Sequence, residues 1–183
     1  MALVNPVILQ VVGYQNSGKT TFISKLLQEL GHCGIKIVTI KHHGHGGKPE
    51  VPNQKDSTKH VTAGAVASIV EGEGRAILQV ESDHFGLEKQ IELLGFFQPD
   101  IILIEGHKQA HYPKIVLLRD KLEIPLLEEV TNIKFIIYWN DQVKNGLESK
   151  VKAPLFSIHD MEAGIMQIVQ RIMYVHKMDE KNL

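Results

Sequence analysis

The sequence is poor in cysteine and has no long apolar run. Cys33 is its single cysteine, so no disulfide can form within the chain, and its loop-like neighbours favour a plain thiol. No apolar stretch approaches the roughly 20 residues that a membrane span requires, and no basic-then-apolar signal segment opens the chain. We therefore expect a cytoplasmic protein without a membrane partner.

An excess of positive charge is also missing. The formal net charge is -1, and lysine and arginine do not cluster, so we expect no nucleic-acid partner. Arginine is scarce and scattered, at Arg75, Arg119 and Arg171. The apolar fraction of 43% and charged fraction of 22% are typical of a folded globular protein. A chain of 183 residues predicts one domain, spanning 1–183.

Short apolar runs alternate with amphipathic stretches along much of the chain. The almost continuously apolar run 6–12 predicts a strand buried on both faces, and apolar residues spaced between 22 and 30 predict a helix that ends at Gly31. Further strands are expected at 35–40, 101–104, 114–118 and 133–138, and further helices at 87–95 and 161–175. This order predicts an α/β fold, a mostly parallel sheet with helices on both faces.

Two stretches depart from that alternation. Residues 43–60 are rich in glycine, proline and polar side chains, which predicts a long loop. Two apolar runs, 65–70 and 76–80, flank Glu71-Gly72-Glu73-Gly74, which predicts a β-hairpin arm around 65–80.

The stretch "VVGYQNSGKT" at 11–20 carries the strongest chemical signal. It fits G-x-x-x-x-G-K-[ST] without a mismatch, between a buried strand and an amphipathic helix. Gly13 and Gly18 allow backbone amides to turn toward phosphate oxygens, Lys19 reaches the outer phosphates, and the Thr20 hydroxyl is a Mg²⁺ ligand. The predicted nucleotide cradle is completed by Asn16, Ser17 and Thr21. The fold is therefore expected to resemble that of P-loop NTPases.

A carboxylate is expected near such a cradle. Glu105 follows the strand 101–104 at the edge where ligands bind, and it is a candidate for holding Mg²⁺ or orienting water; the alternative is an ordinary strand-ending acid. Asp56, with Ser57 and His60, is a candidate to fold over the γ-phosphate, the alternative being a solvated turn with a helix cap. Lys19, Glu105 and Asp56 are thus the candidate catalytic residues.

Histidines gather at 42, 43 and 45. They are either ligands of a transition metal or part of a flexible loop over nucleotide or partner, and the second reading is favoured because no fourth ligand stands at a fixed spacing.

The segments "GYQNSGKTT", "IKHHGHGG", "KDSTKHVTAGA" and "IEGHK" occur in an order and spacing that resembles the MobB family, the molybdopterin-guanine dinucleotide biosynthesis adaptor proteins. The resemblance spans about residues 7 to 170. It implies a P-loop GTP-binding protein with weak GTPase activity that assists a MobA-type nucleotidyltransferase joining GMP to molybdopterin, in molybdenum cofactor maturation. It also implies a homodimer, with the hairpin arm contributing to dimer contacts.

Site residues follow from the same resemblance. It implies that Gly13, Gly18, Lys19 and Thr20 contact phosphate and Mg²⁺, and that Asp56 and Glu105 are acids on the metal side. The usual guanine-reading motif Asn-Lys-x-Asp is absent, and "YWNDQVKN" offers Asn140 and Asp141 after a strand instead.

A P-loop small-molecule kinase using ATP is the alternative function. It would need an acceptor pocket and usually a cationic lid, which three scattered arginines make improbable. No arginine finger is evident, and such a finger can raise the rate by about 10³–10⁵, so slow hydrolysis is expected.

Overall fold

The computed structural model describes residues 6–44, 46–49, 56–147 and 151–181. They form two compact units, Met1–His42 with Leu94–Leu183, and His43–Leu93.

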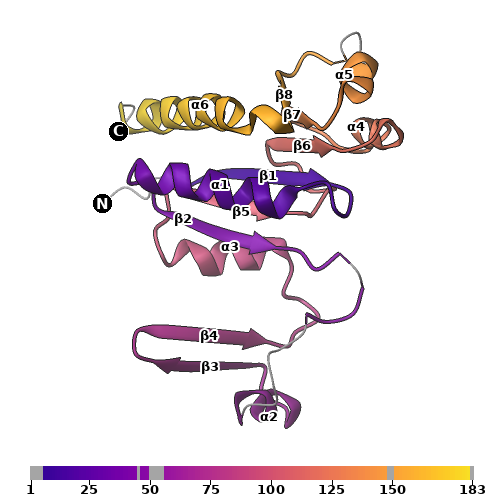
Figure 1. Ribbon diagram of the computed structural model, residues 1–183. Helices are drawn as coiled ribbons and strands as arrows, with labels where there is room; N and C mark the ends of the chain where they lie inside the picture. Colours follow the sequence, from indigo (N-terminus) through magenta and orange to yellow (C-terminus); the bar gives the residue numbers. More distant parts are fainter. Residues whose placement is uncertain (1–5, 45, 50–55, 148–150, 182–183) are drawn as a thin grey trace. The chain divides into compact units, whose positions relative to one another are not determined.

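The larger unit is built on one six-stranded sheet (Figure 1). Its strands lie in the order β2-β5-β1-β6-β7-β8, and every neighbouring pair is parallel. Their bounds are β1 Val7–Gly13, β2 Ile37–Lys41, β5 Ile101–Glu105, β6 Lys114–Leu118, β7 Ile133–Tyr138 and β8 Leu155–Ser157. Because all six run the same way, the chain segments that follow them meet at one edge of the sheet.

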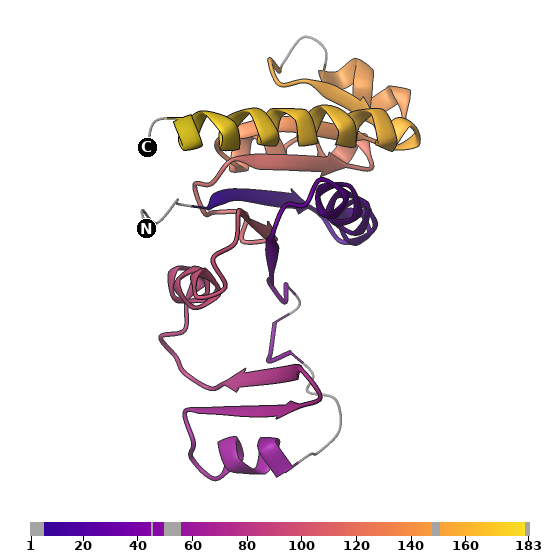
Figure 2. The same cartoon turned by 90° about the vertical axis from the view of Figure 1, so that its left-hand side faces the viewer.

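Helices cover both faces of this sheet (Figure 2), which confirms the predicted fold class. On one face α1 (Lys19–His32) and α6 (Met161–Lys181) pack over the sheet in a core that includes Phe22, Leu26 and Ile168. On the other face α4 (Leu126–Glu129) and α5 (Asp141–Leu147) pack over β6 and β7 through Leu126 and Val143. The 3₁₀ turns Lys121–Glu123 and Ile158–Asp160 precede α4 and α6.

The smaller unit holds the predicted hairpin. Strands β3 (Ala67–Gly72) and β4 (Arg75–Val80) pair antiparallel, with Glu73 and Gly74 at positive φ between them, so the hairpin prediction is confirmed. Helix α2 (Asp56–Thr62) packs against β3, and α3 runs from Leu87 to Gly95 as predicted.

The sequence reasoning missed several short elements. Residues 56–60 were expected in a loop, but they lie in α2, a polar helix whose sequence has no apolar periodicity and whose Val61 is buried. The elements α4, α5 and β8 were not predicted either, because three to seven residues are too few to show a period. In the described part of the chain, no helix is both long and apolar enough to cross a membrane.

Candidate functional site

The predicted cradle lies at the carboxyl end of β1, in the central part of the sheet. Residues 14–18 connect β1 to α1, and Asn16 and Gly18 both have positive φ, at 60° and 89°. Such left-handed residues turn consecutive backbone N–H groups toward one side, which forms a concave anion site at the start of a helix. Ser17 is fully buried beneath the loop, whereas Asn16, Thr20 and Thr21 are exposed at its surface.

Two glycines are required by close packing as well as by conformation. A Cβ on Gly13 would lie 2.6 Å from Ser17 Oγ and 2.7 Å from the main-chain oxygen of Leu117 in β6. A Cβ on Gly18 would lie 3.2 Å from the Trp139 ring, at a φ that side chains rarely adopt. The loop is therefore held against β6 and against the end of β7 by contacts that leave no room for a side chain.

Lys19 folds back over the loop it follows. Its Nζ donates to the Tyr14 carbonyl at 2.6 Å and lies 3.5 Å from Ser17 Oγ. Burial lowers the pKa of Lys19, and the nearby Glu105 carboxylate offsets part of that effect. An anion in the cradle would supply the missing countercharge, so the lysine is placed to bind phosphate.

Glu105 ends β5, next to β1, and meets the cradle from that side. Its Oε1 accepts from Thr20 Oγ1 at 3.4 Å, and its Oε2 forms an ion pair with Lys41 at 3.4 Å. Two adjacent ligands of octahedral Mg²⁺, each about 2.1 Å from the ion, are roughly 3 Å apart. The hydroxyl and carboxylate oxygens therefore fit a shared Mg²⁺.

A buried glutamine positions the turn after Glu105. Gln10 in β1 is fully buried, and its Nε2 donates to the carbonyls of Gly106 and His107, at 3.0 and 2.9 Å. The His107 ring lies against the His42 ring, with centroids 4.4 Å apart and the planes tilted by 41°. Sequence reasoning missed Gln10, although a polar residue within an otherwise apolar strand was a usable signal.

Two more residues missed from the sequence brace the cradle from its other side. Arg119, which follows β6, donates from Nη1 to the Asn16 carbonyl at 3.2 Å. Trp139, which follows β7, donates from Nε1 to the Ser17 carbonyl at 2.9 Å. The Arg119 guanidinium lies 5.2 Å from the centre of the Trp139 ring. The signal available was their position directly after predicted strands.

Asn140 and Asp141 lie at the same edge. The Asn140 side chain accepts from the Val143 N–H and donates to the Arg119 carbonyl at 3.2 Å, so it joins α5 to the end of β6. Asp141 opens α5 and is exposed.

Two other predicted residues belong to the smaller unit. Asp56 begins α2 there, and its side chain lies outside the described residues, as does the whole of His45. Among the residues whose placement is known, no three His, Cys, Asp or Glu side chains gather as metal ligands.

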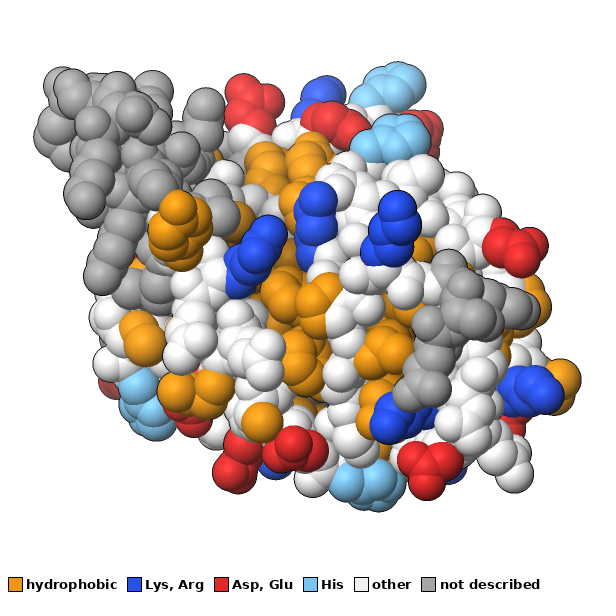
Figure 3. All heavy atoms as spheres, turned by 90° about the horizontal axis from the view of Figure 1, so that it is seen from above, with side chains coloured by type: hydrophobic (Ala, Val, Ile, Leu, Met, Phe, Trp, Pro, Cys, Tyr) orange, Lys and Arg blue, Asp and Glu red, His pale blue; other side chains and the backbone are white. Residues whose placement is uncertain are grey.

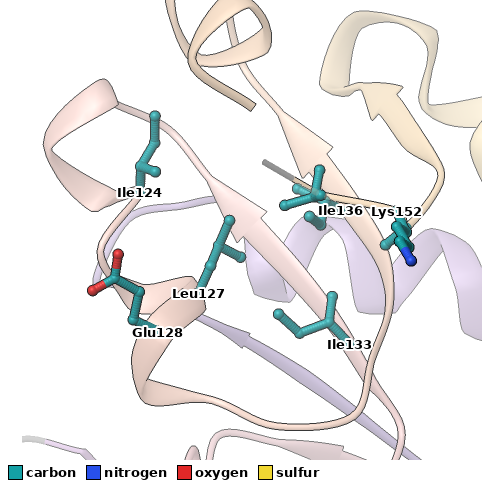
Figure 4. A pocket seen from close by; sticks show the side chains of 8 residues that line it. Ile124, Leu127, Glu128, Ile133, Ile136 and Lys152 are labelled. Atoms are coloured by element: carbon teal, nitrogen blue, oxygen red, sulfur yellow. The ribbon is translucent and has the colours of Figure 1, made fainter. Parts of the chain in front are cut away.

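The larger unit also contains a cavity of about 360 Å³ at a distance from the cradle (Figure 4). It is mainly aliphatic, lined by Ile124, Leu127, Ile133 and Ile136 with Glu128 and Lys152 among the polar groups. Its β7 residues, Ile133 and Ile136, lie within the strand, whereas the cradle follows the carboxyl end of β1. Seen from above, hydrophobic side chains occupy the middle of the molecule's face between Lys and Arg side chains (Figure 3).

Comparisons with known proteins identify the family of this chain. Residues 8–139 match the family described as "MobB: Molybdopterin guanine dinucleotide synthesis protein B". The chain is 46% identical over 163 residues to the "Probable molybdopterin-guanine dinucleotide biosynthesis adapter protein" of Bacillus subtilis, covering 87% of this chain and 91% of that protein.

Solved structures of MobB proteins also resemble this chain. The crystal structure of Bacillus subtilis MobB superposes with a TM-score of 0.76 at 36% identity, over 90% of this chain and 96% of that one. HypB from Helicobacter pylori is similar in fold alone, with a TM-score of 0.54 at 19% identity, over 96% and 89% of the two chains. The chain described here therefore belongs to the MobB family.

Proposed function

We propose that this protein binds GTP with Mg²⁺ in the cradle and hydrolyses it slowly. The observation that carries the proposal is the meeting of Thr20 and Glu105, 3.4 Å apart, beside a lysine-containing anion site at the carboxyl edge of a parallel sheet. Lys19 would contact the outer phosphates, and Thr20 and Glu105 would hold the metal. The bound metal would neutralise charge that develops on the phosphates.

Guanine is the base we propose, read by Asp141. A carboxylate accepts two hydrogen bonds at once from the N1–H and amino group of guanine, and adenine does not offer that pair of donors. Asp141 is exposed at the start of α5, on the edge that carries the cradle. Asn140, bonded to Val143 and Arg119, would fix its position.

Slow hydrolysis is expected from the kind of cation that lies near Thr20 and Glu105, where the metal would bind. The groups there are lysines, with Lys41 bound to Glu105 and Lys19 bound to its own loop. Arg119 donates to a loop carbonyl on the side of β6. Among the described residues of the larger unit no arginine is directed at the γ-phosphate side, so turnover would lack a contribution of about 10³–10⁵ from that unit.

In the cell, we propose that the protein works in the cytoplasm as an adapter in molybdopterin guanine dinucleotide synthesis, with a MobA-type nucleotidyltransferase as its partner. The support is the name of its Bacillus subtilis relative, an adapter protein of that pathway. The nucleotide state would control the contact with the partner and its molybdopterin.

We propose further that the protein is a homodimer joined through the hairpin. Two cross-strand aliphatic pairs, one on each face of β3 and β4, are exposed. A two-stranded sheet alone is only marginally stable, so the hairpin would be stabilised if these pairs were covered. A second copy would bury them. The exposed side chains are Val66, Ile69, Val70, Ile77 and Leu78. The prediction of a single domain with an arm stays a proposal of the same kind.

Calorimetry with Lys19→Ala and Lys25→Ala tests the nucleotide proposal. Lys25 is exposed on α1 and serves as the matched control. We expect Lys19→Ala to abolish binding of GTP·Mg²⁺ and Lys25→Ala to leave it unchanged. Equal affinities in wild type and Lys19→Ala would refute the cradle's role.

The kinase alternative is separated by phosphate release. A slow GTPase releases phosphate without an acceptor, whereas a kinase consumes ATP only when an acceptor is present. Co-purification with the nucleotidyltransferase, with and without GTP, tests the adapter role; no complex in either state would contradict it.

A further inference from the structure

The cradle has two ends, and the structure distinguishes them. Thr20 and Glu105, on the β5 side of β1, fit the metal that bridges the outer two phosphates of a bound triphosphate. The γ-phosphate of a bound triphosphate would therefore lie toward β5. The nucleoside would then lie on the opposite side, where β6 and β7 end.

That opposite side carries Arg119 and Trp139, of which the arginine lies over the tryptophan ring. The exposed Arg119 guanidinium lies over the Trp139 ring, 5.2 Å from its centre. Hydrogen bonds from both side chains to the carbonyls of Asn16 and Ser17 fix them to the cradle itself. Asn140 Nδ2 holds the Arg119 main chain in addition. Two contacts thus orient the guanidinium beside the nucleoside end, and two more fix its tryptophan neighbour and its own main chain.

From this geometry we infer that Arg119 is the stacking platform for the purine base and that Trp139 supports it from behind. The inference rests on the proposed nucleotide binding. A guanidinium plane stacks well on aromatic rings, and Arg119 is exposed while its Nη1 is bonded to the Asn16 carbonyl. Asn-Lys-x-Asp is absent from this chain, and the Arg119–Trp139 pair would support the base in place of the lysine of that motif. The stacking itself is independent of base type, so discrimination remains with Asp141.

Trp139 also makes the inference measurable, because it is the single tryptophan of the chain. A base stacked on Arg119 would change the surroundings of the indole more than a bare phosphate chain, which would act on Trp139 only through the Ser17 carbonyl and Gly18. We expect saturating GTP·Mg²⁺ to shift or quench the tryptophan emission. Tripolyphosphate with Mg²⁺, which fills only the cradle, should change it much less.

The decisive experiment compares the affinities of GTP·Mg²⁺ and tripolyphosphate·Mg²⁺ by calorimetry, in wild type, Arg119→Ala and Arg171→Ala. Arg171 is exposed on α6 and is the matched control. For Arg119→Ala we expect GTP to bind about tenfold more weakly, the size of loss typical of a cation–ring contact. Tripolyphosphate should bind within about twofold of wild type. Arg171→Ala should change neither.

An equal loss for both ligands in Arg119→Ala would overturn the inference, because the arginine would then act on the phosphates or on the loop. Unchanged GTP affinity in Arg119→Ala, or tryptophan emission that GTP and tripolyphosphate change alike, would also overturn it. Wild-type protein that binds tripolyphosphate as tightly as GTP would refute the base site alone. Wild-type protein that binds neither ligand would refute the proposed function as well.

Discussion

Replacing Gly13 by alanine tests whether the cradle is held in shape by backbone packing. The added Cβ would lie 2.7 Å from the Leu117 main-chain oxygen and 2.6 Å from Ser17 Oγ, both closer than real Cβ contacts. Leu117 is a buried residue of β6 and Ser17 is fully buried, so neither neighbour can move away without cost.

The expected magnitude follows from that crowding. Overpacking a tight site costs about 1–3 kcal/mol, and in a chain of this size each kcal/mol lowers the melting temperature by about 2–4 °C. Because the relief must come from the loop, we also expect Gly13→Ala to weaken GTP binding. Differential scanning calorimetry and nucleotide titration measure the two effects.

Gly31→Ala is the matched control. Gly31 lies within α1, and a Cβ there would meet nothing within 4 Å. Alanine is the better helix former, so we expect a gain of about 0.5–1 kcal/mol and unchanged GTP binding. If Gly13→Ala melts and binds like wild type, the loop is not held by these contacts and the packing argument fails.

Three further predictions concern charge and assembly. Burial lowers the pKa of Lys19, so the unfolded chain keeps a proton that the folded chain has lost between that lowered pKa and 10.5. The free energy of unfolding of the wild type should therefore rise relative to that of Lys19→Met as the pH increases through this window. A difference in melting temperature between the two proteins that does not change with pH would contradict this. Glu105→Gln should weaken GTP binding by about 10–100-fold in the presence of Mg²⁺ and leave GTP binding without Mg²⁺ unchanged. An equal loss of GTP affinity with Mg²⁺ and with EDTA would refute the metal role of Glu105. Ile77→Lys on the hairpin should give a monomer by light scattering, and a persistent dimer would place the interface elsewhere.

The local elements of this fold could be predicted because their signals are local. The strands at 114–118 and 133–138 agree with the structure residue for residue, since buried parallel strands are continuous apolar runs. The cradle could be predicted because phosphate binding by such a loop requires glycines, a lysine and a hydroxyl at fixed spacing before a helix. Helix α2 was missed because its short polar sequence carries no such period.

The sequence by itself thus determined that a glycine-rich P-loop motif follows β1 and that acids follow later strands. Only the tertiary structure decided which of these groups meet. The strand order places β5 on one side of β1 and β6 on the other, so Glu105 joins Thr20 while Arg119 reaches Asn16, 103 residues away in the chain. Sequence spacing carries no record of that order, because neighbours in a parallel sheet are chosen by how crossover helices pack rather than by their distance along the chain.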